Sequence, residues 1–359
     1  MIIFGAPFRY YQGRGILKNT GEILKPMGEK FFLISDAMVF SLFGETLDAA
    51  FASAGLGSVR GEFNGESSDA EITRLHELYK ASGCDAVVGM GGGKALDTAK
   101  GLSIVTNAPV ALIPTTAASD APVSNIAMIY KADHSKDRVA PMRYSPWCII
   151  MDTDVILKAP LRMFISGIGD AAATKFEAEA CLASGAKNYL NGQPPKTAKA
   201  LCDLCWDIIY NQSLEAVASV KSGTFSDAFD AVVEASALLS GLGFVNGGLA
   251  AGHAMSSGLT YVPAALKSTH GELVSFGILV QFVLEKRPQA FMDDMLAFLK
   301  GVGLPTTLAQ LGVTEADRGD ITKMVHKICT PPNLVYNMPC EITPDILKKA
   351  IYTADAMGR

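Results

Sequence analysis

The sequence has little charge, no long apolar run and no pattern of paired cysteines, and each shortage excludes a class of protein. Charged residues make up 19% of the 359, and the net charge of −5 gives no electrostatic reason to bind nucleic acid or an anionic membrane. No uninterrupted apolar run reaches the roughly 18 residues that a membrane helix needs. The N-terminal residues lack the basic segment, apolar core and cleavage site of a signal peptide, so we expect no export and no membrane partner.

Cysteine is too irregular here to form a disulfide framework. The seven cysteines are odd in number and scattered, which favours a reducing, cytoplasmic setting. Cys202 and Cys205 form a CxxC motif, which is compatible with redox or zinc chemistry. The motif lies in an amphipathic helical stretch without a second CxxC, so we expect two buried helix cysteines instead.

The distribution of apolar residues changes near residues 153–160 and predicts two domains. Before this point short apolar runs alternate with helical spacing, which is typical of an α/β, Rossmann-like domain with a mostly parallel sheet. After it strand-like runs end and helical spacing continues, which predicts an all-helical domain. We therefore expect an α/β domain over residues 1–155 and an all-α domain over 156–359. The predicted strands are 30–35, 86–90, 110–113, 127–130 and 147–151, and the clearest helices are 45–54, 68–82, 94–104, 171–184, 195–209, 228–242 and 271–284.

Two of only five histidines, His253 and His270, lie 17 residues apart in glycine-rich, apolar sequence. Asp170 lies upstream in a similar setting. Two imidazoles and a carboxylate are three ligands for a divalent metal, with a fourth position left for a substrate oxygen. The adjacent glycines allow backbone or substrate to approach closely. The alternative is that each histidine is a satisfied core residue and that Asp170 is a helix N-cap.

Gly91, Gly92, Gly93 and Lys94 lie between a predicted strand and a predicted helix. Glycines at such a turn let the backbone wrap a phosphate at the helix N-terminus, and the lysine adds positive charge. The segment matches neither the P-loop nor the GxGxxG pattern, and a tight turn without a ligand is the alternative. Three successive glycines lower backbone order without an evident structural need, so we favour a phosphate-bearing ligand.

Two further segments follow predicted strands and are expected at the same edge of the sheet. Asp36 ends the first strand, where a carboxylate can accept hydrogen bonds from an adenosine ribose and repel the 2′-phosphate of NADP. It can equally cap the next helix. In the loop after Ile113, Thr115, Thr116 and Ser124 offer hydroxyls for phosphate or nicotinamide, and Asp120 is suited to a polyol, although such loops usually serve turn chemistry.

Together these segments resemble the glycerol dehydrogenases of the iron-containing (group III) alcohol dehydrogenase superfamily. The resemblance extends nearly from end to end, through five motifs in the same order. They are 91–100, 114–122, 167–171, 240–244 and the two histidine segments. The resemblance implies the dehydroquinate synthase-like architecture, in which the α/β domain binds NAD and the helical domain binds a metal.

The resemblance also implies a role for each of these residues. Zinc would be bound by Asp170, His253 and His270, and Asp120 would contact the substrate. The implied NAD contacts are Asp36, Gly91, Gly92, Gly93, Lys94, Asp97, Thr115, Thr116, Ser124 and Tyr130. Iron-using relatives carry further histidines where this chain has Thr174 and Ser256, and the remaining three ligands favour zinc over iron.

The implied reaction is NAD-dependent oxidation of a small polyol, with glycerol giving dihydroxyacetone by hydride transfer from a zinc-bound alkoxide. One departure affects the substrate: Ser256 and Ser257 replace a histidine–asparagine pair, and Lys175 stands where tryptophan is common. The alternatives are another vicinal diol, a hydroxyketone or a hydroxy acid. A lyase similar to 3-dehydroquinate synthase is a weaker alternative, because segments 160–180 and 240–275 contain only Arg162, Lys175 and Lys267 as cations. Family members form homo-oligomers, which we expect here as well.

Overall fold

A computed structural model describes residues 1–131 and 135–359. The chain divides into two compact units. The first, called the α/β unit, comprises Ala6–Ala117 and Ala121–Pro160. The second, called the helical unit, comprises Met1–Gly5, Ala118–Asp120 and Leu161–Arg359. A short piece of the predicted cofactor loop, including Asp120, thus belongs to the helical unit.

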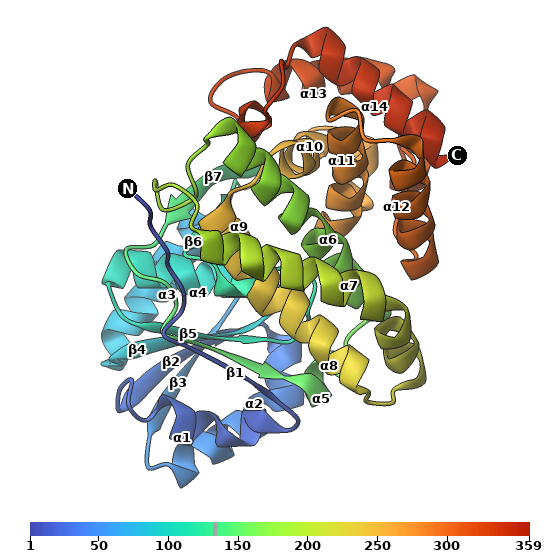
Figure 1. The fold of residues 1–359 in the computed structure, drawn as a ribbon. Coiled ribbons are helices and arrows are strands. Elements are labelled where there is room, and N and C mark those ends of the chain that lie inside the picture. The colour runs from blue at the N-terminus through green and yellow to red at the C-terminus, as the bar shows by residue number, and fades with distance from the viewer. Residues whose placement is uncertain (132–134) are drawn as a thin grey trace. The chain divides into compact units, whose positions relative to one another are not determined.

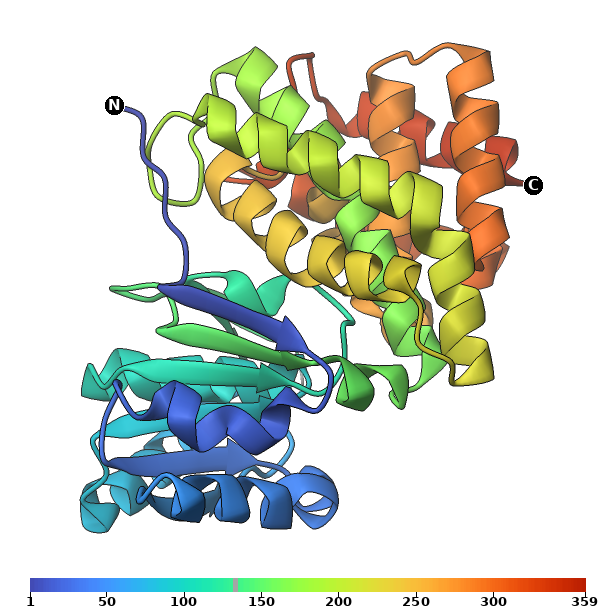
Figure 2. The ribbon, with the colours of Figure 1, turned by 60° about the horizontal axis from the view of Figure 1, so that its bottom comes forward.

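A parallel sheet forms the centre of the α/β unit (Figure 2). Its strands are β1 (Arg9–Gly13), β2 (Lys30–Ser35), β3 (Gly57–Glu62), β4 (Ala86–Gly91), β5 (Val110–Pro114) and β8 (Cys148–Asp152). They lie in the order β1-β8-β5-β4-β2-β3, and every neighbouring pair is parallel. The antiparallel pair β6 (Ile126–Tyr130) and β7 (Lys136–Pro141) lies apart from this sheet. The predicted, mostly parallel sheet is confirmed.

Helices cover both faces of the sheet (Figure 1). They are α1 (Thr20–Leu24), α2 (Ala37–Ser53), α3 (Asp69–Ser82), α4 (Gly93–Thr106) and the short α5 (Thr153–Leu157). Neighbouring residues of β2 show the alternation: the ring of Phe31 lies 5.2 Å from that of Phe51 on α2, and the ring of Phe32 lies 5.8 Å from that of Tyr79 on α3. Because both faces are buried, the central strands are continuously apolar, which made them visible in the sequence.

Three strands, β1, β3 and β7, are absent from the sequence prediction. β1 and β3 are the two edges of the sheet, and most of their residues keep some exposure. β7 is the mostly exposed strand of the two-stranded pair. An edge strand tolerates polar residues on its open side, so no apolar run identifies it. The sequence predicted this helix only from residue 45. The structure begins α2 at Ala37, directly after Asp36, whose side chain caps the helix at its N-terminus.

The helical unit confirms the predicted all-α character of the second half. Its α-helices are α6 (Leu161–Ser184), α7 (Lys196–Ser222), α8 (Asp227–Glu234), α9 (Ser240–Gly247), α10 (Ala251–Leu259), α11 (His270–Leu284), α12 (Gln289–Val302), α13 (Arg318–Ile328) and α14 (Pro344–Gly358). Cys202 and Cys205 are buried on α7 as free thiols, as predicted.

α8 and α9 are joined by η3 (Ala235–Leu239), a turn of π-helix, into one helix over Asp227–Gly247. These 21 residues are long and apolar enough to cross a membrane by length and composition, although no uninterrupted apolar run marks them. The structure buries 72% of the most apolar window, as expected for a core helix. A π-turn shifts the helix register, and Ser240 follows it directly.

Candidate metal centre and cofactor loop

Asp170, His253 and His270 come together in the helical unit. They lie on α6, α10 and the first position of α11, and one ligand atom from each lies within 4.8 Å of the others. Nε2 of His253 lies 3.2 Å and Nε2 of His270 lies 3.1 Å from the same Oδ1 of Asp170. Two imidazole nitrogens and a carboxylate oxygen aimed at one point fit a divalent metal such as zinc.

The three side chains differ in exposure, which gives the cluster an open side. Asp170 is wholly buried, and His253 is nearly so. The side chain of His270, in contrast, is 47% exposed. A metal held there would be open to a substrate on the His270 side, as a catalytic site requires.

Glycines next to the ligands allow the helices to approach this closely. A Cβ added to Gly169 on α6 would lie 2.5 Å from the carbonyl oxygen of Gly271 on α11. A Cβ added to Gly271 would overlap the carbonyl of Ser166. The backbones of α6 and α11 therefore touch beside Asp170 and His270. This agrees with the expectation that glycine beside a ligand permits close backbone approach.

The pKa values of Asp170 and His253 are shifted in opposite directions. Burial raises the pKa of Asp170, but the imidazoles of His270 and His253 outweigh it and hold the pKa well below its usual range. Burial also disfavours the charged form of His253, yet Glu177 and Asp170 raise its pKa well above the usual value. Asp170 is thus favoured as a carboxylate, and the protonated form of His253 is favoured by its two acidic neighbours, so a metal at this site has to displace a proton.

Asp120 lies directly against the metal ligands. Its backbone N–H donates to Oδ2 of Asp170 over 3.1 Å, and its own Oδ2 accepts from the hydroxyl of Ser240 over 2.7 Å. Burial and then the neighbouring Asp170 raise the pKa of Asp120 well above its usual value. Ser240 in turn lies 2.7 Å from Oγ1 of Thr174. Thr174, where the resemblance implies a histidine in iron-using relatives, is therefore engaged in a buried hydroxyl chain.

Ser256, the other position where the resemblance implies a histidine in iron-using relatives, lies beside the cluster. Its Oγ is 3.2 Å from Nδ1 of His270, so the ring nitrogen that faces away from Asp170 has a partner.

Sequence reasoning missed Ser240 as the partner of Asp120, and it also missed Glu177. Glu177 follows Asp170 by seven residues, two helical turns, and this spacing was the available signal. Its Oε2 lies 2.5 Å from Nδ1 of His253.

The glycine loop joins β4 to α4 in the α/β unit. Gly91 has φ of +144°, a conformation that side chains rarely adopt, and Gly92 is the N-cap of α4. A Cβ added at Gly92 or Gly93 would meet nothing within 4 Å. Packing therefore does not explain these two glycines, whereas a ligand that approaches the helix N-terminus does.

Asp36 and Thr115 lie at the same edge of the sheet as the glycine loop. Asp36 follows β2, the neighbour of β4, and its Oδ1 accepts the N–H of Val39 over 2.8 Å as the N-cap of α2. The structure thus shows the capping role that the sequence left as one of two interpretations. The N–H of Thr115 donates to the carbonyl of Gly91 over 3.0 Å, which ties the loop after β5 to the glycine loop. Thr116 adjoins it and is partly exposed.

Lys94 lies beside the glycine loop but is already paired. Its Nζ is 2.8 Å from Oε2 of Glu66 and 5.5 Å from the centre of the Tyr130 ring. Burial raises the pKa of Tyr130 to about 12. A phosphate at the glycine loop has to compete with Glu66 for this lysine.

Asp97 and Ser124 lie deeper, around Lys100. The Nζ of Lys100 donates to Oγ of Ser124 over 2.9 Å and lies 3.9 Å from Asp97. Burial raises the pKa of Asp97 to about 6, against the lowering effect of Lys100. Both residues contact the interior of the unit, below the loop that the resemblance assigns to NAD.

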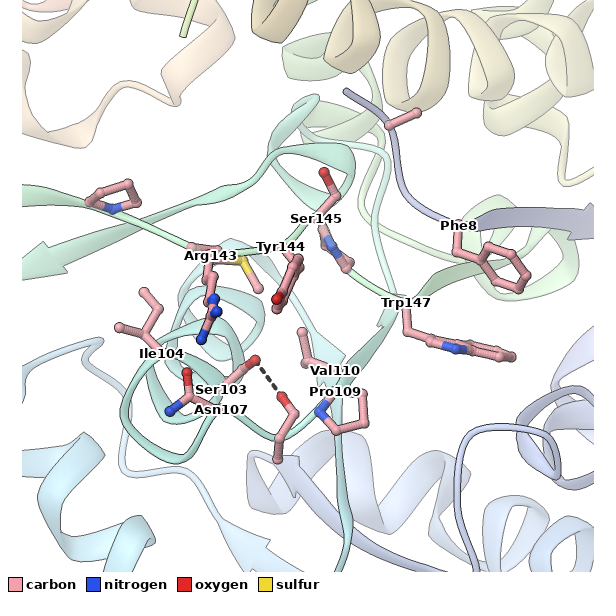
Figure 3. Close-up of a pocket in the computed structure, with 15 residues that line it drawn as sticks. Phe8, Ser103, Ile104, Asn107, Pro109, Val110, Arg143, Tyr144, Ser145 and Trp147 are labelled. Carbon is pink, nitrogen blue, oxygen red and sulfur yellow. Dashed lines mark hydrogen bonds between the residues drawn. The ribbon is translucent and has the colours of Figure 1, made fainter. Parts of the chain in front are cut away.

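A pocket of about 870 Å³ lies at the other edge of the same sheet (Figure 3). It is formed where α4 ends and where β5 and β8 begin, with Phe8, Tyr144 and Trp147 among its lining residues. None of the residues singled out from the sequence line it. The pocket lies at the amino ends of the strands, whereas the glycine loop lies at their carboxyl ends. Parallel sheets bind ligands at the carboxyl ends, so this pocket is not the proposed cofactor site.

Comparison with known proteins gives a family match to the α/β part of the chain and full-length matches to individual proteins. A family model described as iron-containing alcohol dehydrogenase matches residues 7–153. The chain is 38% identical to glycerol dehydrogenase of Escherichia coli O6:H1 over 99% of this chain and 97% of that protein. It is 36% identical to glycolaldehyde reductase of Halobacterium salinarum, over 99% and 98% of the two chains. The crystal structure of a probable glycerol dehydrogenase from Sinorhizobium meliloti matches with a TM-score of 0.94 and 33% identity, covering 100% of this chain and 99% of that one.

Proposed function

Because this chain belongs to the iron-containing alcohol dehydrogenase family and is an oxidoreductase, we propose that it oxidises a small polyol with NAD. We propose glycerol as the substrate and dihydroxyacetone as the product. The observation that carries this proposal is the cluster of Asp170, His253 and His270, which is buried except on the His270 side. Such a cluster is suited to hold a metal against which a diol can be oriented.

Zinc is the metal that we propose for the cluster. When bound, it supplies a Lewis acid that lowers the pKa of an alcohol, and NAD supplies the hydride acceptor. Asp170, His253 and His270 would hold the metal. Thr174 and Ser256 have no imidazole to add to this set. Their hydroxyls contact Ser240 and His270 respectively. A set of three protein ligands with one open position is common for catalytic zinc.

The chain's own residues orient the substrate. Asp120 is held by Ser240 and by its backbone bond to Asp170, so its carboxyl group has a fixed place next to the ligands. We propose that it accepts a hydrogen bond from a second hydroxyl of the polyol. Such fixed contacts supply much of the rate enhancement, because they replace the entropy cost of bringing the reacting groups together.

NAD is proposed to bind at the carboxyl edge of the α/β unit. Gly92 and Gly93 leave space for the diphosphate at the N-terminus of α4. Lys94 would exchange Glu66 for a phosphate oxygen, and Asp36 would accept hydrogen bonds from the adenosine ribose. The remaining proposed contacts are Gly91, Asp97, Thr115, Thr116, Ser124 and Tyr130.

The lyase alternative is disfavoured by the charges around the cluster. A phosphorylated, carboxylated sugar needs several cationic side chains free to bind it. Arg162 is paired with both carboxylate oxygens of Glu272, at 2.8 and 2.7 Å, and Lys175 lies 3.3 Å from Asp203. Two of the three cations in segments 160–180 and 240–275 are therefore engaged by acidic partners. Another vicinal diol, a hydroxyketone or a hydroxy acid remains the second candidate substrate, and the similarity to a glycolaldehyde reductase favours it.

Metal analysis and an NAD-linked activity screen test the proposal together. We expect about one zinc per chain and chelator-sensitive reduction of NAD with glycerol, 1,2-propanediol or a short hydroxy acid. His253→Ala should lose zinc and activity while its affinity for NAD, measured by fluorescence titration, stays unchanged. Full activity in this variant, or no NADH formation with any diol or α-hydroxy compound in zinc-loaded protein, would refute the proposal.

We also propose a cytoplasmic homo-oligomer. Seven free thiols suit a reducing compartment. Phe8 and Tyr144 line the same pocket and are 65% and 70% exposed, and exposed apolar side chains that lie together are commonly buried by subunit contacts. Light scattering of the purified protein gives the oligomeric state directly, and a monomer at micromolar concentration would contradict this part.

A further inference from the structure

The N-terminus of α10, the helix that carries His253, is held by a carboxylate from α6. Oε1 of Glu177 accepts the backbone N–H groups of Ala250 and His253, both over 2.8 Å. Its other oxygen, Oε2, lies 2.5 Å from Nδ1 of the His253 ring. Glu177 is wholly buried. One carboxylate therefore fixes both the backbone and the ring of a metal-ligand candidate.

The neighbouring N–H of α10 is held from another helix. Oε1 of Gln281 on α11 accepts the N–H of Gly252 over 3.2 Å. The helices that provide these two caps, α6 and α11, also carry Asp170 and His270. The start of α10 is thus tied to both helices that carry the other two ligands.

From this arrangement we propose that Glu177 is a positioning residue for metal binding, which keeps the proton of His253 on Nδ1 and leaves Nε2 for the metal. The inference rests on the metal site proposed above. A neutral imidazole carries its proton on one of two nitrogens, and the hydrogen bond to the other nitrogen decides which. Since Nδ1 faces a carboxylate, it donates, and Nε2 is left pointing at Oδ1 of Asp170 over 3.2 Å. Partners of this kind commonly orient metal-binding histidines.

A capping role alone does not account for the geometry. Both backbone N–H groups go to Oε1, whereas Oε2 is directed at the imidazole. The backbone also makes room for this carboxylate, because a Cβ added at Gly252 would lie 3.0 Å from Cδ of Glu177. A glutamine here keeps one oxygen for the cap but presents an amide N–H₂ to the ring. That N–H₂ favours the wrong tautomer, so Glu177→Gln separates the two roles.

The experiment measures zinc affinity by competition with a chromophoric chelator, and stability by urea unfolding of the zinc-free proteins. For Glu177→Gln we expect zinc to bind about 10- to 100-fold more weakly than to the wild-type chain. Gln281→Met is the control, since it removes a cap from the same helix, together with the Gln281 bonds to the Phe176 carbonyl and to Glu285, without touching the His253 ring. We expect it to lower the unfolding midpoint while its zinc affinity stays within about threefold of wild type.

The outcomes distinguish this inference from the proposed function. If the wild-type chain binds no zinc, the proposed metal site fails. If it binds zinc and Glu177→Gln binds equally well, or if both variants lose affinity in proportion to their stability, the positioning role is wrong. Should Glu177→Gln not fold, ¹⁵N spectra of histidine-labelled, zinc-loaded wild type decide the question. Both imidazoles that respond to zinc should be bound through Nε2 and protonated on Nδ1, and an Nδ1-bound imidazole would overturn the inference.

Discussion

Lys100 is a lysine without exposed surface, and its replacement by methionine tests how much this residue stabilises the loop after β5. Its Nζ donates to the carbonyls of Ala121 and Ile126, over 2.5 and 2.9 Å, and to the hydroxyl of Ser124. It also lies 3.9 Å from Asp97. Methionine fills a similar volume but leaves these oxygens and the carboxylate without their cation.

The expected loss of stability is large. Removing one partner of a buried, hydrogen-bonded charge pair typically costs about 3–5 kcal/mol, out of a total stability of roughly 5–15 kcal/mol. The loss should also depend on pH. The pKa of Asp97 is about 6 in the folded state and 3.8 in the unfolded state. The protonated Asp97 carboxyl group therefore contributes fully to stability below pH 3.8, and this contribution is lost as the pH rises through about 6. Without Lys100 this pKa rises further, so the deficit of the variant should widen from pH 5 to pH 8.

Urea unfolding of zinc-free protein at the two pH values measures this effect. Asp97→Asn in the Lys100→Met background should restore part of the loss at pH 8, because it removes the uncompensated carboxylate. Lys80→Met is the control, since Lys80 pairs with Glu77 on the exposed surface of α3 and its loss should leave stability almost unchanged. A deficit below about 1 kcal/mol for Lys100→Met, or one that is the same at both pH values, would refute the reasoning.

Three further predictions concern the cofactor and the metal. Asp36→Asn keeps an N-cap for α2 but removes a charge, so stability to urea should be unchanged while the ratio of kcat/KM for NAD over NADP falls about tenfold or more; an unchanged ratio would exclude the ribose role. Gly271→Ala forces a methyl group against the carbonyl of Ser166, so the free energy of unfolding should fall by about 1–3 kcal/mol and zinc should bind more weakly. Unaltered zinc affinity would show that the α6–α11 contact does not set the ligand spacing. Zinc affinity should rise with pH between 6 and 9 because the raised pKa of His253 means that the metal displaces a proton, and calorimetry in buffers of different ionisation enthalpy should detect its release; a flat profile would contradict this.

The sequence allowed the fold class to be predicted because its signals are local. The central strands β2, β4, β5 and β8 are buried on both faces and so read as short apolar runs between helices. The edge strands β1 and β3 gave no such signal, since their exposure permits polar residues. The glycine loop was recognisable because three successive glycines are unusual in any strand-to-helix turn.

The residue types of the metal cluster were also determined by the sequence. Two histidines and an aspartate beside glycines suggested ligands, and the end-to-end resemblance strengthened this interpretation. At the cofactor site the sequence left open whether Asp36 acts as a helix cap, and the structure shows that it does. Its role toward the ribose stays a prediction.

Only the tertiary structure decided which residues support the ligands. Glu177, Ser240 and Lys100 are separated from their partners His253, Asp120 and Ser124 by 76, 120 and 24 positions. Periodicity reports contacts within one element, whereas these contacts depend on how α6, α9, α10 and the loop after β5 pack. A sequence thus reveals which groups can bind a metal or a phosphate, but the burial and hydrogen bonds that orient those groups arise only when distant helices meet.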